Sequence, residues 1–178
     1  MKTISAFLIA GLLLGSLPSF GQLSVDKGTK FLNVGIGFGG WGGLAFGGRS
    51  IALGASAELG LRRNISVGPL VGFQTYRDVG SWFSVGGRGS YHFNELLRLS
   101  DNKLDLYAGL GLIYSGFTYS NEYRTLYRSL GIGNPTTYGG IDIGGHLGAR
   151  YFFNEKIGGF AEAGFGVAPL QLGLTARF

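Results

Sequence analysis

The sequence ends with Leu170-Gln171-Leu172-Gly173-Leu174-Thr175-Ala176-Arg177-Phe178. Apolar residues occupy every second position of this stretch, and polar residues or glycine occupy the positions between them. Because successive side chains of a β-strand point to opposite faces, this period of two predicts a strand with one apolar and one polar face. The predicted strand ends on an aromatic residue at the last position of the sequence.

Seven further segments alternate in the same way, so the sequence predicts eight strands. The polar faces of these segments consist mainly of glycine and serine. Pro69 interrupts the third segment and predicts a bulge or a local edge there. The eight segments cover residues 32–38, 51–59, 65–76, 83–93, 104–115, 141–151, 157–165 and 170–178.

The composition restricts the class of protein. Glycine accounts for 35 of the 178 residues, and only 14% of the residues are charged. Beyond the N-terminal apolar run, the most apolar stretch, residues 43–61, contains Arg49 and Glu58, which argues against membrane-spanning helices. The absence of cysteine excludes disulfides and thiolate metal sites. The formal net charge of +5 comes without a run of Lys or Arg, and it favours contact with anionic lipopolysaccharide over nucleic acid.

Alternation alone does not decide whether the apolar face meets lipid or fills the core of a soluble, lipocalin-type barrel. The small side chains of the polar faces suit the narrow interior of an eight-stranded barrel. The sequence also stops within its last strand, and aromatic residues lie near the segment ends, where the interfacial girdles of membrane barrels occur. We therefore predict an all-β fold, an eight-stranded antiparallel up-and-down transmembrane β-barrel, over residues 22–178. The aromatic residues concerned are Phe38, Tyr91, Phe93, Tyr114, Tyr151, Phe165 and Phe178.

The N-terminus has the pattern of a secretory signal peptide. Lys2 precedes an apolar run over residues 4–17, and Ser19 and Gly21 are small residues at the −3 and −1 positions of a cleavage site. We predict a signal peptide at residues 1–21; the alternative, a membrane anchor, needs about 20 apolar residues. With both barrel termini in the periplasm, turns at 62–64, 94–102 and 153–156 would be periplasmic. Loops at 39–49, 78–81, 116–137 and 166–169 would be external.

Three stretches, at residues 90–97, 103–111 and 148–158, resemble the small outer-membrane β-barrel family with OmpA/OmpX-like architecture. The last strand, ending at Phe178, resembles the assembly signal that the barrel-assembly machinery recognises in such proteins. The resemblance implies an outer membrane of a Gram-negative bacterium, with lipid and lipopolysaccharide as surroundings and the assembly machinery as a partner during biogenesis. It supplies no catalytic or ligand-binding residue. We expect a monomer that does not bind nucleic acid.

Charged residues on the inward faces must be paired, because an isolated buried charge is costly. They form either an ion path or a structural salt-bridged core, and we favour the core. Pairing across a turn near Asn154 would place His146 opposite Glu162. The predicted interior polar network consists of Glu58, Arg88, Asp142, His146, Arg150 and Glu162.

The long loop at 116–137 contains a predicted helix over residues 120–131. Tyr123, Leu126, Tyr127 and Leu130 follow helical spacing, Ser120 or Asn121 can cap its start, and Gly131 can end it. The helix is either a recognition element for an anionic partner or a lid on the barrel or its interface. The interaction candidates in this loop are Tyr123, Arg124, Tyr127 and Arg128.

From the sequence we predict that the protein is not an enzyme. The two histidines lie on inward faces of separate strands, no His-x-Ser occurs, and no metal-ligand spacing or phosphate-binding loop is present, so we expect no catalytic residue, metal or cofactor. The predicted role is structural or surface interaction. The alternative is a narrow pore for ions or small solutes, because glycine on the inner face leaves room.

Overall fold

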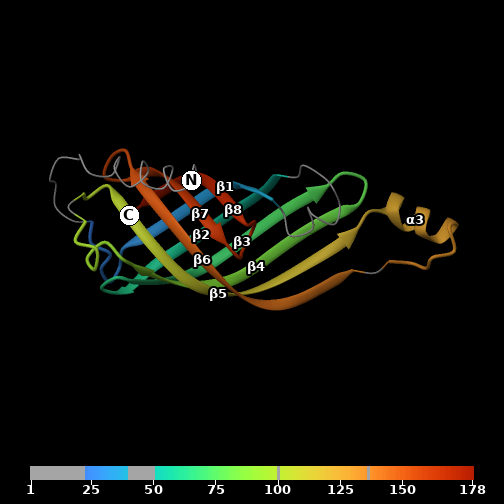
Figure 1. The fold of residues 1–178 in the computed structure, drawn as a ribbon, viewed down its shortest axis with the longest axis horizontal. Helices are drawn as coiled ribbons and strands as arrows, with labels where there is room; N and C mark the ends of the chain where they lie inside the picture. The colour runs from blue at the N-terminus through green and yellow to red at the C-terminus, as the bar shows by residue number, and fades with distance from the viewer. Residues whose placement is uncertain (1–22, 40–50, 100, 136) are drawn as a thin grey trace, which may run out of the picture.

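The computed structural model describes residues 23–39, 51–99, 101–135 and 137–178. Each of eight strands pairs antiparallel with the next, and β8 pairs with β1 to close a barrel, as predicted (Figure 1). The signal peptide predicted at 1–21 and almost all of the predicted loop at 39–49 lie outside the described residues. The strands are β1 (Lys30–Phe38), β2 (Ile51–Arg62), β3 (Ile65–Tyr76), β4 (Gly80–His92), β5 (Leu104–Tyr119), β6 (Tyr138–Phe152), β7 (Ile157–Gly164) and β8 (Leu170–Arg177).

A single helix is found in these ranges, α3 (Asn121–Ser129), and it connects β5 to β6. It falls within the helix predicted over residues 120–131. No helix in the part of the chain that the structure describes is both long enough and apolar enough to cross a membrane.

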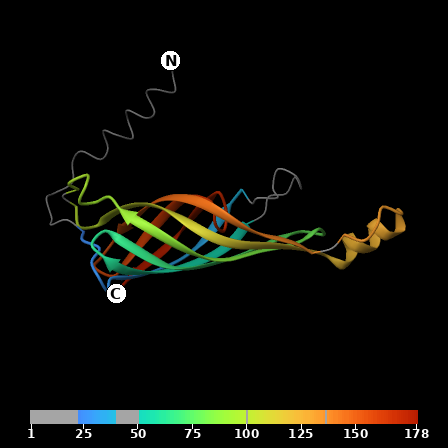
Figure 2. The same ribbon diagram turned by 90° about the horizontal axis from the view of Figure 1, so that it is seen from below.

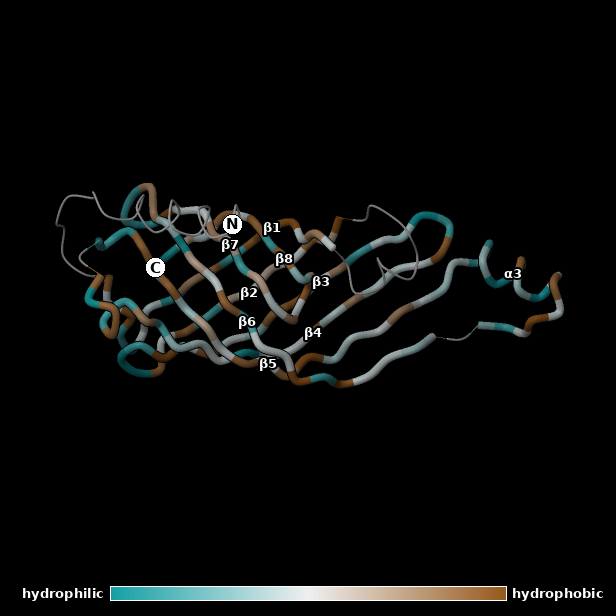
Figure 3. The backbone as a smooth tube through the Cα atoms, viewed as in Figure 1, coloured by the Kyte–Doolittle hydropathy of each residue, from teal (hydrophilic) through white to brown (hydrophobic). Residues whose placement is uncertain are grey.

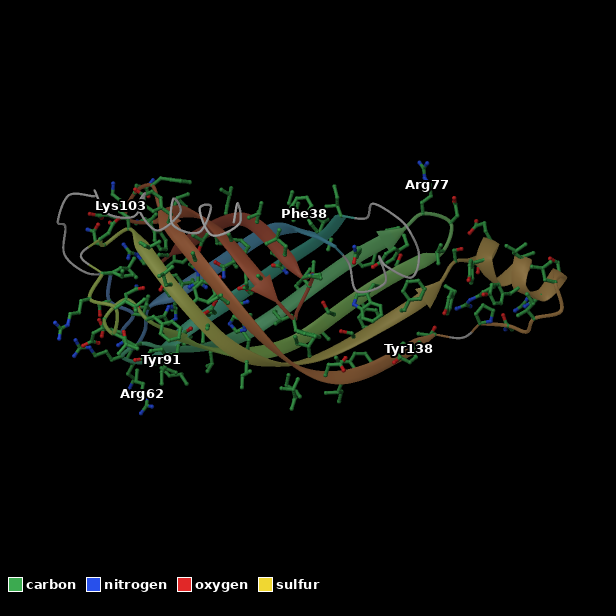
Figure 4. The ribbon with its side chains drawn as sticks, viewed as in Figure 1. Phe38, Arg62, Arg77, Tyr91, Lys103 and Tyr138 are labelled. Atoms are coloured by element: carbon green, nitrogen blue, oxygen red, sulfur yellow. The ribbon has the colours of Figure 1, made fainter. Side chains whose placement is uncertain are left out.

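The end of the barrel that holds Lys30 and Phe178, here called the terminal end, has the connections expected from the sequence. The turn between β2 and β3 consists of Arg63 and Asn64, and Asn64 adopts φ 62°, a conformation that asparagine tolerates better than most residues. Residues 153–156 connect β6 to β7, and residues 93–103 connect β4 to β5. Figure 4 labels Arg62, Tyr91 and Lys103 near this end.

Pro69 does not end the third strand. It pairs with Gly87 of β4 in an unbroken ladder, whereas the ladder between β2 and β3 is interrupted between Ser56–Leu70 and Leu59–Val67. A proline lacks the N–H that a ladder needs on one side, which accounts for an interruption toward one neighbour only. The register shift in this pair of strands lies between Gly60 and Arg62, closer to the turn.

The barrel wall is uneven in height. β4, β5 and β6 contain 13, 16 and 15 residues, whereas β7 and β8 contain 8 each. The β5–β6 ladder reaches Phe117–Tyr138, but the β6–β7 ladder stops at His146–Gly164. Residues 116–135 and 137–140, here called the extension, therefore project past the short strands and carry α3 far from the terminal end (Figures 1 and 2).

The outer surface of the barrel is apolar. Leu110 is 66% exposed and Ile143 75%, and apolar residues recur along every strand (Figure 3). Aromatic side chains bound this surface, with Tyr91 toward the terminal end of β4 and Phe83 toward its other end. Phe83 and Tyr91 are eight positions apart, which corresponds to about 27 Å along the strand, or about 21 Å at a tilt of about 40°. This height is close to the apolar band of about 25 Å in outer-membrane barrels.

The turn between β7 and β8 folds into the barrel. Val167 and Ala168 are 5% and 3% exposed, and together with Ala52, Leu70 and Ile113 they form an apolar cluster inside. The sequence predicted an external loop at residues 166–169, and its alternation gave no sign that two side chains of this connection point inward. Two glycines make the room: a Cβ at Gly54 would lie 3.0 Å from Val167, and one at Gly72 would lie 2.6 Å from it.

Gly72→Ala is expected to lower the free energy of unfolding by about 1–3 kcal/mol, because the added methyl group overpacks Val167 and Ser84. Val167→Ala in the same chain should recover part of the loss. Gly87→Ala is the matched control, since its Cβ would meet nothing closer than the Gly68 carbonyl oxygen at 4.0 Å. Urea unfolding of the refolded protein measures the three variants. Equal losses at Gly72 and Gly87 would contradict the inward position of the turn.

Candidate functional site

Glu58 of β2 lies at the centre of the barrel's polar interior. Its Oε1 accepts a hydrogen bond from Nη2 of Arg88 at 2.6 Å and another from Nη2 of Arg150. Its Oε2 accepts from the Ser66 hydroxyl at 2.7 Å. Glu58 is 3% exposed and Arg150 is fully buried. One carboxylate oxygen thus binds two guanidinium groups, one from β4 and one from β6.

Each guanidinium group has a second acidic partner. Arg88 Nη1 donates to both carboxylate oxygens of Glu162, at 2.8 Å each. Arg150 Nη1 donates to Asp105 Oδ2 at 2.7 Å. Tyr107 donates from its hydroxyl to Glu162 at 2.9 Å, and its ring centroid lies 4.1 Å from the Arg150 guanidinium carbon. The cations are therefore neutralised by direct contacts rather than by water, as buried charges require.

His92 connects two members of this network. Its Nδ1 donates to Asp105 at 2.8 Å, and its Nε2 lies 2.9 Å from the Ser66 hydroxyl. Because Ser66 donates its only proton to Glu58, its oxygen accepts from Nε2 of His92. The imidazole of His92 therefore joins the Asp105 carboxylate to the Ser66 hydroxyl that binds Glu58.

The Ser66, His92 and Asp105 side chains are connected in the order found in serine hydrolases. All three are 0% exposed, and the Ser66 proton is already donated to a carboxylate. A substrate therefore has no access to the hydroxyl, and the arrangement is a structural contact. Among the residues that the structure describes, no cluster of three or more His, Cys, Asp or Glu side chains could hold a metal ion.

The predicted network residues do not all come together. Glu58, Arg88, Arg150 and Glu162 are in direct contact, as described above. His146 pairs with Gly164 rather than Glu162, and its Nε2 contacts the Ser90 hydroxyl at 2.9 Å. Asp142 is exposed and lies apart from the network, because its strand continues beyond the end of β7 there. These two placements differ from the expectation.

Several members of the network carry weaker signals in the sequence. Three further buried residues bind its charged groups: Tyr107, Asn33 and Asn94. Asn33 accepts a hydrogen bond from Arg150 Nε at 3.2 Å, and Asn94 donates one to Asp105 at 3.2 Å. Tyr107 and Asn33 share the inward register of their strands, which is the only feature that could have identified them. Asn94 lies beyond the end of β4, where no alternation extends.

The terminal end of the barrel is closed by the segment that precedes β1. Leu23 and Val25 are 3% and 0% exposed and pack with Phe31 and Phe152. The Leu23 carbonyl accepts from Asn94 at 3.2 Å, and the Val25 carbonyl accepts from the Asn64 amide at 2.8 Å. Three layers therefore fill the interior in series: this apolar layer, the charged network, and the apolar cluster around Val167.

Aromatic rings hold α3 against the end of β5. Ser120 caps the helix by accepting from the Tyr123 amide at 3.1 Å, as predicted. The rings of Tyr119 and Tyr123 stack at 5.3 Å, and those of Tyr123 and Tyr127 lie 4.6 Å apart. The hydrogen bond from the Tyr123 hydroxyl to that of Tyr127, at 2.9 Å, raises the pKa of Tyr123 to about 12.

The helix does not form a lid on the barrel, because the extension carries it beyond the mouth (Figures 1 and 2). Of the four interaction candidates, Tyr123 and Tyr127 are half-buried in the ring stack. Arg128 is exposed and donates to Asn134 at 3.2 Å. Arg124 is partly exposed and follows Tyr123 on the helix. At the opposite end, Phe178 is 72% exposed, and its backbone exchanges hydrogen bonds with Lys30 at 3.0 and 3.1 Å.

Comparison with solved structures places this architecture among known folds. The N-terminal β-barrel domain of OprF from Pseudomonas aeruginosa is similar, with a TM-score of 0.50 and 16% identity over 89% of this chain and 99% of that one. The chain has the fold of a small eight-stranded outer-membrane β-barrel. The outer membrane protein Ail of Yersinia pestis in a phospholipid nanodisc gives a TM-score of 0.50 and 12% identity, over 85% of this chain and 100% of Ail.

A de novo designed transmembrane β-barrel is also similar, with a TM-score of 0.51 and 15% identity over 86% of this chain and 98% of the design. No family model matches the sequence. No curated protein has a significantly similar sequence. The similarity at these identities therefore concerns the fold.

Arg150→Met is expected to lower the free energy of unfolding by about 3–5 kcal/mol, because it leaves the carboxylates of Glu58 and Asp105 buried without their shared cation. Arg62→Met, at an exposed position, is the control and should change it by less than about 0.5 kcal/mol. Equilibrium unfolding in urea, in the same detergent or vesicles for all proteins, measures both. A loss below about 1 kcal/mol for Arg150→Met would show that the network does not hold the interior together.

Proposed function

We propose that this protein is an integral outer-membrane protein of a Gram-negative bacterium whose closed barrel anchors the extension at the cell surface. Its role is structural or surface interaction, without catalysis. The observation that carries the proposal is the combination of an apolar outer face, bounded by aromatic rings, with an interior filled by three layers of side chains. Such a barrel holds a surface element in place and has no transport path through the described interior.

The orientation follows from the unequal ends of the barrel. The terminal end, with its short turns, faces the periplasm, and the extension with α3 faces outward, as is usual for such barrels. In this orientation lipid surrounds the apolar face, and lipopolysaccharide surrounds the upper wall. Arg124 and Arg128 are then the cations of α3 that meet anionic groups. Phe178 directly follows β8, where the barrel-assembly machinery would recognise the last strand, and the folded protein is a monomer.

The alternative function, a narrow pore, requires a continuous water-filled path. The charged network supplies polar groups along such a path, which is the one observation in its favour. However, Arg88 and Arg150 are bound on both sides by carboxylates, and apolar layers lie above and below them. We therefore propose the anchor rather than the pore.

The lipid-facing position of Leu110 gives a direct test of the membrane assignment. Leu110→Arg should lower the free energy of unfolding by about 2–4 kcal/mol, because it places a charge on the outer face in the middle of β5. Leu126→Arg is the matched control, since Leu126 is 52% exposed on α3 and lies outside the barrel wall. Folding into vesicles followed by urea titration measures the difference. Equal tolerance of both substitutions would contradict a lipid-facing outer surface.

Single-channel recording in planar bilayers distinguishes the anchor from the pore. The refolded protein should give no steady conductance steps, and neither should a variant in which residues 120–131 are replaced by a Gly/Ser linker, because the layers that close the barrel lie below the extension. Both proteins should keep heat-modifiable mobility on gels. Steady, uniform conductance of the wild-type protein would replace the anchor by the pore.

A further inference from the structure

An apolar groove lies on the outer wall of the barrel and reaches its terminal end. Its volume is about 410 Å³, within the range of about 300–1,000 Å³ that is typical of small-molecule sites. The floor consists of alanines, because Ala149 of β6 pairs with Ala161 of β7, and Ala163 follows on the same outer face. Larger apolar side chains stand around this floor: Phe93, Leu97, Leu106, Leu147 and Leu170.

The connection between β4 and β5 forms one side of this groove, since Leu97 belongs to it. The connection is held against the barrel wall, because the Asn94 side chain accepts a hydrogen bond from the Leu106 amide at 2.8 Å. Nevertheless, Leu96 and Leu97 are 66% and 54% exposed. A fixed segment that presents two adjacent leucines at the surface continues the apolar outer face of the barrel and is suited to contact with lipid.

The groove begins at the aromatic ring that bounds the apolar surface at the terminal end. The rings of Tyr91 and Phe93 lie 5.1 Å apart in an edge-to-face arrangement, and Phe93 also lines the groove. The rings of Tyr151 and Phe153 form a similar pair at 6.4 Å. Aromatic girdles of membrane barrels lie at the membrane–water interfaces. The groove therefore leads from the headgroup level at Phe93 into the hydrocarbon toward Leu170, so lipid is what covers it.

Arg98 supplies a cation beside the groove. It follows Leu97, its side chain is exposed, and the described ranges of the chain contain no hydrogen-bond or ion-pair partner for it. Its φ of 51° is left-handed, at the end of a helical turn in which the Leu99 amide donates to the Asn94 carbonyl at 2.9 Å. Glycine is the usual residue at such an end. An arginine in this strained conformation indicates a use for its guanidinium group.

We propose that the groove binds an acyl chain of a phospholipid of the inner leaflet, with the Arg98 guanidinium on the phosphate of the same lipid. The acyl chain matches the apolar lining, because the one charged residue there, Glu162, has its carboxylate bound by Arg88 inside the barrel. The phosphate matches the free cation at the headgroup level. The inference rests on the proposed function, since the terminal end faces the inner leaflet only in the proposed orientation.

Native mass spectrometry of the refolded full chain in detergent measures the bound lipid. During titration with dimyristoylphosphatidylglycerol, we expect a single lipid per barrel to be retained before further lipids add without preference. Dimyristoylglycerol has the same acyl chains without the phosphate, and it should bind at least about fivefold more weakly, as expected for loss of contact with one cation at a lipid surface. Equal binding of the two lipids, or a dimer of the chain in place of the lipid complex, overturns the proposal.

Filling the groove tests its role directly. Ala161→Phe places a ring on the floor and should abolish the preferential binding of the first lipid. Ala55→Phe is the matched control, because Ala55 pairs with the exposed Val34 and Val71 and so lies on the outer face of β2, away from the groove. Heat-modifiable gel mobility verifies that both variants fold. Unchanged lipid binding by folded Ala161→Phe overturns the proposal.

Removing the cation tests the second contact. Arg98→Gln should weaken the binding of dimyristoylphosphatidylglycerol by about fivefold and leave that of dimyristoylglycerol unchanged. Arg62→Gln is the control, since Arg62 is an exposed arginine at the same end of the barrel. An equal loss in both variants would reduce the effect to the general charge of this end, and it would overturn the role of Arg98.

The groove and the membrane anchor fail by different results. The wild-type protein is also folded into vesicles of dimyristoylphosphatidylglycerol, and heat-modifiable mobility reports insertion. Normal insertion without a preferentially retained lipid overturns the groove proposal and leaves the anchor in place. Failure of the wild-type protein to insert overturns the anchor, and with it the orientation on which the groove proposal rests.

Discussion

The carboxylate of Glu58 is the group on which the interior of this barrel depends. It accepts hydrogen bonds from a hydroxyl on the neighbouring strand β3 and from guanidinium groups on β4 and β6, so one side chain connects β2 to two strands with which it does not pair. A slip of one residue in the register of any of these strands would turn its charged group into the lipid-facing surface. The network therefore specifies which residues pair around the barrel, in addition to whatever stability it contributes.

The sequence predicted the parts of the fold that depend on alternation. The number of strands, the turn positions at the terminal end and the inward position of Glu58, Arg88, Arg150 and Glu162 all follow from a period of two. The helix was also predictable, because Ser120 and the spacing of Tyr123 and Tyr127 are local signals. The inward position of the β7–β8 turn was not predictable, because Val167 and Ala168 lie in a short connection without an alternating pattern.

The lengths of the strands at the mouth of the barrel were also not predictable. Gly116, Gly139 and Gly140 have no side chain to continue the alternation, so the sequence pattern ends before β5 does and begins after β6 does. Asp142 shares the inward register of the network residues, yet it lies above the point where β7 stops. Its separation from the other charges depends on the length of a different strand, which no local pattern reports. The extension projects past the barrel because β7 stops short of β5 and β6.

The pairing of β1 with β8 has a consequence for how the protein folds. Seven of the eight ladders join neighbours in the sequence and can form as local hairpins, whereas this one brings Phe31 to Arg177. Contacts between distant residues form slowly, because a long loop must close before they contribute. The seam is therefore the last ladder to form, and until then the charges of Glu58, Arg88 and Arg150 lie on an open sheet. Inside a lipid bilayer such a sheet would expose these charges to an apolar environment, and closure of the seam is what encloses them.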